Sequence, residues 1–131
     1  MVLQRDTTVA IWGQALPESI VYLSPSWGNI IKVKSDSNGF WKALSETTND
    51  QKNHSLQIKA GKDKIFINDI LLGEVWLASG QSNMEMDFDY CCNSTDSAHQ
   101  VLSNDIFNNI RMFNVKKRYS LHPSSDIDGR C

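Results

Sequence analysis

The chain has 131 residues, of which 40% are hydrophobic and 21% charged, and its formal net charge is −2. This length and composition are those of roughly one ordinary globular domain, able to bury about two-thirds of its unfolded surface. Without a basic excess, a nucleic-acid partner held through its phosphates is not expected. A membrane partner is not expected either, because no stretch approaches the ~20 apolar residues of a spanning helix. Three cysteines are too few for a disulfide scaffold.

The first 72 residues are expected to form strands. Short runs rich in β-branched, aromatic or alternating apolar residues occur at 8–12, 19–23, 31–34, 40–44, 56–58 and 65–67. The letters DSNG at 36–39 predict a turn, because Asn and Gly tolerate positive φ, and hence a hairpin between the third and fourth runs. Short strands at this spacing predict an antiparallel β-sandwich of jelly-roll or Ig-like type.

The character of the sequence changes at Gly73. The letters VWLA at 75–78 form a continuous apolar run, which predicts a strand buried on both faces. A helix carrying Ala98, Val101 and Leu102 and a strand over 110–115 are expected to follow, which is the opening of an α/β unit. We therefore predict an accessory domain over 1–72 and the start of a second domain over 73–131.

The four tryptophans are divided between core and surface by their positions. Trp12 and Trp41 fall in predicted strands and Trp76 in the predicted buried run, so all three are expected in the core. Trp27 lies in a predicted turn between PS and G, and is the one expected to be exposed.

The letters GQSNM at 80–84 follow the predicted buried strand and precede a predicted helix. Unpaired N–H groups and the helix dipole at such a place can stabilise an oxyanion. Gly80 permits a sharp turn, and Ser82 would project into the crevice at the end of the sheet. The alternative is structural, because a serine after a glycine is commonly the N-cap of a helix. The pattern also differs from the Gly-x-Ser-x-Gly elbow, since Asn83 and then Met84 follow Ser82.

The surroundings of this pentapeptide closely resemble a known family. Residues 73–86, GEVWLASGQSNMEM, resemble the first block of the sialate O-acetylesterase-like proteins of the SGNH hydrolase superfamily. Further similar stretches follow the family's order: MVLQR at 1–5, Val9, IWG at 11–13, GFW at 39–41, NIRMF at 109–113, and Asp128 with Gly129. Ala78 departs from the family, which often has Cys there, and Cys131 stands where Trp is common.

The resemblance implies a fold and a chemistry. The fold implied for 73–131 is the first part of a flavodoxin-like SGNH α/β domain. Ser82 would be the acyl-accepting nucleophile, with its N–H in the oxyanion hole, while Gly80, Gln81 and Asn83 would shape that loop. The implied reaction is two-step hydrolysis of O-acetyl esters of sugars, sialic acid among them. No metal or organic cofactor is implied.

The implied base is missing from the sequence. The family supplies it from a distant Asp-x-x-His, and the only literal match, Asp96 to His99, lies just after the nucleophile block, where we interpret it as part of a solvated helix. The chain is therefore expected to be an incomplete, inactive N-terminal portion. Relatives are usually secreted, periplasmic or lysosomal, but no signal peptide is predicted at Met1, so the compartment is undetermined. The alternative function is a non-catalytic β-sandwich module that binds carbohydrate or another partner.

Overall fold

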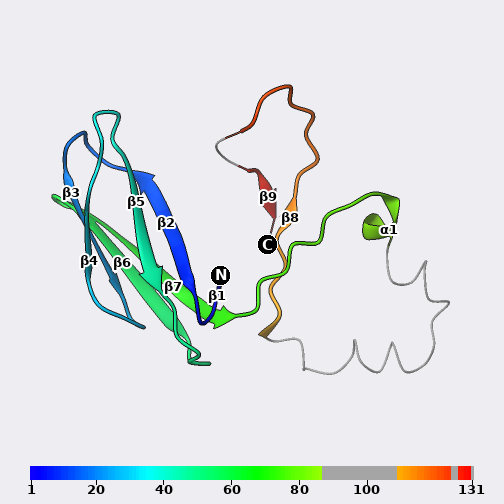
Figure 1. The fold of residues 1–131 in the computed structure, drawn as a ribbon, viewed down its shortest axis with the longest axis horizontal. Helices are drawn as coiled ribbons and strands as arrows, with labels where there is room; N and C mark the ends of the chain where they lie inside the picture. Colours follow the sequence, from blue (N-terminus) through cyan, green and yellow to red (C-terminus); the bar gives the residue numbers. More distant parts are fainter. Residues whose placement is uncertain (87–108, 125–126, 131) are drawn as a thin grey trace. The chain divides into compact units, whose positions relative to one another are not determined.

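A computed structural model describes residues 1–86, 109–124 and 127–130. The chain divides into two compact units, Met1–Leu77 and Ala78–Cys131. Strands make up nearly all of the regular structure in the first unit, whereas the described part of the second contains one short helix and two short strands (Figure 1). No helix in the described ranges is long and apolar enough to cross a membrane.

The first unit has a five-stranded sheet facing a two-stranded one. The larger sheet has the order β1 (Val2–Gln4), β7 (Asp63–Gly73), β6 (His54–Ala60), β3 (Ile20–Pro25) and β4 (Ile31–Lys34). The smaller sheet pairs β2 (Thr8–Gln14) with β5 (Phe40–Glu46). Every pairing is antiparallel except that of β1 with β7, which is parallel. The unit is thus a curled mixed β-structure that agrees with the predicted sandwich.

All six strands predicted within the first 72 residues are present, but the predicted hairpin is wrong. The turn itself forms: the Asp36 carboxylate accepts the N–H groups of Asn38 and Phe40, both at 2.8 Å, and Gly39 has a φ of +82°. The strands on its two sides nevertheless belong to different sheets, since β4 pairs with β3 and β5 with β2. The turn carries the chain from one layer to the other.

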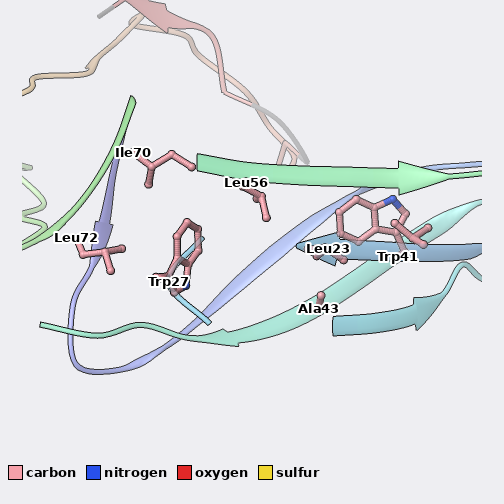
Figure 2. Packing of buried hydrophobic residues seen from close by; sticks show 8 residues of the cluster. Leu23, Trp27, Trp41, Ala43, Leu56, Ile70 and Leu72 are labelled. Atoms are coloured by element: carbon pink, nitrogen blue, oxygen red, sulfur yellow. The ribbon is translucent and has the colours of Figure 1, made fainter. Parts of the chain in front are cut away.

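The core lies between the two sheets. Strand β5 alternates strictly between exposed and buried side chains, as expected for a strand with one face in a core. The buried hydrophobic cluster, most of which is labelled in Figure 2, consists of Val21, Leu23, Trp27, Trp41, Ala43, Leu56, Ile70 and Leu72. The indole N–H of Trp27 donates to Ser45 Oγ at 3.2 Å, which satisfies two polar groups buried in this core.

The expectation for the tryptophans is wrong at three of the four positions. Trp41 is buried as predicted, but Trp27, expected at the surface, is also buried. Trp12 is 61% exposed and Trp76 is 86% exposed, although both were expected in the core. For Trp12 the reason is the pleat, because it lies directly opposite the exposed Lys42 and so faces outward.

The first five residues are fastened to the end of β7. Arg5 and Gln4 donate to the two carboxylate oxygens of Glu74 at 2.9 and 3.0 Å, and the Gln4 side-chain oxygen accepts the N–H of Val75 at 2.8 Å. These hydrogen bonds, from Gln4 and then from Arg5, hold the pKa of the Glu74 carboxyl below its usual value. Residues 1–5 therefore cover the edge of the chain at residues 71–75, with β1 as the outermost strand of the sheet.

The predicted buried strand over 75–78 is not a strand. Val75 is 55% exposed and Leu77 is 91% exposed, and this extended segment pairs with no strand in the described part of the chain. An apolar run becomes a buried strand only where neighbouring strands and covering helices exist. The segment follows β7 as an exposed apolar connection.

The second unit contains α1 (Ser82–Glu85) and a ribbon of β8 (Asn114–Val115) with β9 (Gly129–Arg130) in antiparallel pairing. The predicted strand over 110–115 is reduced to its last two residues, and β9 was not predicted. The predicted helix carrying Ala98, Val101 and Leu102 lies outside the described residues. The SGNH character of 73–131 stays a prediction.

Candidate active site

Ser82 is the first residue of α1, and its side chain is exposed. The helix is closed by two backbone hydrogen bonds, from Met84 N–H to Gln81 O at 2.9 Å and from Met86 N–H to Ser82 O at 3.1 Å. Its N-cap is Gln81, in an extended conformation and without a side-chain capping bond. The alternative in which Ser82 serves as the N-cap is therefore wrong, and its hydroxyl is not used to cap the helix.

Gly80 occupies a backbone position that favours glycine over other residues. Its φ is +157°, and a Cβ added there would come within 2.9 Å of Met84 Cγ. Both facts favour glycine at the point where the extended segment turns into the helix. The predicted sharp turn is thus present just before Ser82, with Gln81 as the single residue between them.

The N–H groups of Ser82 and Asn83 have no acceptor within the described residues. The first N–H groups of any helix lack intrahelical partners, so the start of a helix can donate hydrogen bonds to an oxygen atom from outside it. Because α1 has only four residues, its dipole is small, and these N–H groups rather than a macrodipole are the electrophilic feature of this turn.

The hydroxyl of Ser82 makes no hydrogen bond to a described side chain, and the structure describes two of the three histidines, His54 and His122. His54 is buried in the first unit, with 7% of its surface exposed. Its Nδ1 lies 3.1 Å from Ser26 Oγ, and its ring is edge-on to the Trp27 ring. His122 is exposed, and its backbone N–H donates to Ser120 Oγ. His99 lies outside the described residues.

The ribbon of the second unit is basic. Lys116 pairs with Asp128 at 3.4 Å, and a hollow of about 580 Å³ is lined by residues of β8, β9 and their extensions, including Lys117 and Arg130. No group of three His, Cys, Asp or Glu side chains is placed to hold a metal ion in the ranges that the structure describes. The chemistry offered by the described second unit is therefore an exposed serine hydroxyl together with cationic side chains.

Comparison with known proteins gives a consistent set of relatives, although no family model matches the chain. The chain is 26% identical to the sialate O-acetylesterase of Rattus norvegicus over 98% of its length, and 27% identical to that of Mus musculus over 97%. A solved structure of a carbohydrate acetylesterase from Xanthomonas citri matches 98% of the chain with a TM-score of 0.82 and 31% sequence identity.

These matches define the chain as a relative of carbohydrate esterases. Within that class it is homologous to the sialate O-acetylesterases, and the family resemblance seen in its sequence is confirmed. The chain spans about a quarter of the length of these curated relatives, 25% of each, and 29% of the Xanthomonas citri chain.

Proposed function

We propose that this chain is the nucleophile-bearing N-terminal portion of an esterase that removes O-acetyl groups from sugars, with Ser82 as the nucleophile. The observation that carries the proposal is the coincidence of the family's nucleophile block with an exposed serine hydroxyl just after the Gly80 turn. The names of the relatives supply the class of reaction and of substrate. Sialic acid is the sugar that the mammalian names favour.

The proposed reaction has two steps. Ser82 Oγ attacks the carbonyl carbon of the acetyl ester as its proton passes to a base, and the oxyanion that forms is held by N–H groups such as those of Ser82 and Asn83. The C–O bond to the sugar then breaks, and the sugar oxygen takes the proton. Water, deprotonated by the same base, attacks the acetyl-serine, which releases acetate and restores Ser82.

The base is proposed to be an Asp-x-x-His that these 131 residues do not supply. The isolated chain is then expected to be inactive, because a serine hydroxyl without a base is a weak nucleophile. Incubation with p-nitrophenyl acetate tests this part: rapid turnover that Ser82→Ala abolishes would contradict it and would point to His99 as the base. Turnover at the level of buffer supports it.

The role of Ser82 is tested in a chimera, so that an inactive fragment does not leave the question open. The Xanthomonas citri esterase, with its matched 29% replaced by this chain, supplies the remaining catalytic parts. We expect the chimera to hydrolyse acetyl esters, Ser82→Ala to abolish turnover and the control Ser79→Ala, another exposed serine nearby, to retain it. A folded, active chimera that keeps its activity with Ser82→Ala would refute the assignment.

A further inference from the structure

Three lysines and a tyrosine form a row across the outer face of the five-stranded sheet. Lys64 of β7 lies directly opposite Lys59 of β6. Tyr22 of β3 lies between Lys59 on one side and Lys32 of β4 on the other. All four side chains are exposed, whereas the next residue along β3, Leu23, points into the core, so this lysine row faces away from the core.

The pairing of Lys59 with Lys64 is unfavourable for the fold. Like charges directly opposite each other on one face destabilise an antiparallel pair of strands. Among the described residues, no carboxylate lies within ion-pair distance of Lys59, Lys64 or Lys32, although the first unit contains as many acidic as basic side chains. The row therefore gathers positive charge that no described side chain neutralises.

Protection of the sheet edges accounts for only part of this arrangement. Lysines on edge strands oppose the addition of a foreign strand, and both Lys32 on β4 and Lys64 on the uncovered part of β7 fit that role. Lys59 does not, because β6 pairs with β3 on one side and with β7 on the other. A lysine in the middle of the sheet, opposite a second lysine, indicates a surface that receives an anion.

Two aromatic rings position the outer lysines of the row. Lys64 Nζ lies 4.7 Å from the centroid of the Phe66 ring, and Lys32 Nζ lies 5.9 Å from the centroid of the Tyr22 ring. These cation–π contacts favour an ammonium group above one face of each ring. A base of single-stranded nucleic acid would need such ring faces for stacking, so the arrangement favours a different kind of anion.

Hydrogen-bonding groups adjoin the lysine row. On the same outer face, Gln57 of β6 lies opposite Ser24 of β3, and Tyr22 contributes a phenol hydroxyl. Ammonium groups next to amide and hydroxyl groups suit a ligand that carries carboxylates together with hydroxyls. Neighbouring strands lie about 4.8 Å apart, so the row extends over about 14 Å, which suits a chain of acidic sugars better than a single sugar.

We propose that the lysine row binds a sugar chain that carries several carboxylates and lies across the strands from β7 to β4. The assignment of these carboxylates to sialic acids rests on the proposed function and on the names of the mammalian relatives, because a sialate is an anion. The preference for an anion rests on the sheet face alone. The first unit then retains sialylated chains whose O-acetyl groups the esterase removes.

The test measures binding of α2,8-linked polysialic acid without O-acetyl groups to the whole chain, by calorimetry and two-dimensional NMR. Neutral dextran, monomeric N-acetylneuraminic acid and single-stranded oligothymidylate are compared with it at equal concentration of repeating units. We expect polysialic acid to bind, with shifts at the lysine row and weaker affinity as salt is added. Dextran is expected not to bind, and the monomer to bind about tenfold more weakly or less.

Lys59→Gln is the decisive variant, and Lys64→Gln is the second. Each removes one ammonium group from the row and is expected to weaken binding by about two- to fivefold, the usual effect of one exposed ion pair. Both variants also relieve the repulsion between the two lysines, so their melting temperatures are expected to stay equal or rise. Lys42→Gln makes the same change of charge on the outer face of the smaller sheet, and is expected to leave binding unchanged.

Absence of polysialic acid binding at millimolar repeating units, or an equal effect of Lys59→Gln and Lys42→Gln, would overturn the proposal. Tighter binding of oligothymidylate than of polysialic acid would also overturn it, because the face would then suit nucleic acid. The catalytic proposal is judged separately by the chimera, since the polymer has no ester to hydrolyse. Binding without chimera activity would separate the lysine row from the role of Ser82.

Discussion

Replacement of Trp27 by alanine tests the burial that the sequence pattern did not predict. Trp27 is only 7% exposed. Its indole N–H donates to Ser45 Oγ, and its ring contacts the His54 ring edge-on, with 5.8 Å between the ring centroids. Truncation of a buried tryptophan costs about 3–5 kcal/mol, and the buried Ser45 hydroxyl would lose its indole donor. For a unit of the size of Met1–Leu77, the total free energy of unfolding is about 4–12 kcal/mol.

Trp27→Ala should therefore remove most of the stability of the first unit. The matched variant is Trp12→Ala, which deletes the same side chain from a position that is 61% exposed and is expected to change stability by about 0.5 kcal/mol or less. Trp27→Phe should lie between them, at about 1–3 kcal/mol, because it keeps a ring but loses the hydrogen bond to Ser45.

Urea unfolding followed by far-UV circular dichroism measures these differences, because the signal reports the strands and does not depend on the deleted indoles. The free energies are compared at equal slope with denaturant. Equal costs for Trp27→Ala and Trp12→Ala, or a cost below about 1 kcal/mol for Trp27→Ala, would refute the structural reasoning that places one indole inside and the other outside.

Three further results are expected. Gly39→Ala should destabilise the first unit more than Gly61→Ala: both glycines have positive φ, at a cost of about 1–2 kcal/mol for alanine, but only at Gly39 would the new Cβ meet backbone, and equal melting temperatures would contradict this. Glu74→Gln should reduce the loss of stability that acidification below about pH 4.5 causes. A carboxyl with a lowered folded-state pKa stabilises the fold above its unfolded-state pKa, and this stabilisation is lost as the pH falls through the folded-state pKa. If urea unfolding at acidic pH shows the same loss of stability in the variant, the hydrogen bonds from Gln4 and Arg5 to Glu74 do not stabilise the fold. Ser82→Ala should leave thermal unfolding unchanged, since the hydroxyl makes no described hydrogen bond, and a clear shift would reveal a structural role.

The strands of the first unit were predictable because their signal is local. Alternation with a period of two appears in β4 and β5 and requires no knowledge of the partner strand. The pairing was not predictable by the same means. The Asp36 turn has the composition of a hairpin turn, yet which strands it separates depends on the layers that they join.

Burial of individual side chains also depended on distant residues. Trp27 is covered because Ser45 and His54, remote in sequence, pack around a turn that looked exposed. At the candidate site, the Gly80 turn and the helix beginning at Ser82 followed from short-range pattern. A catalytic base cannot be found in that way, because it reaches a nucleophile through tertiary structure from a distant part of the chain.

The parallel pairing of β1 with β7 has a consequence for folding during synthesis. Val2 pairs with Leu71 and Gln4 with Gly73, so the residues of β1 are synthesised about 70 positions before their partners. The chain must close a loop of that length before these hydrogen bonds can form. The entropy cost of this closure favours slow, late docking of β1. Until Gly73 and Glu74 have left the exit tunnel, β7 has an additional open edge and the nascent first unit is unfinished.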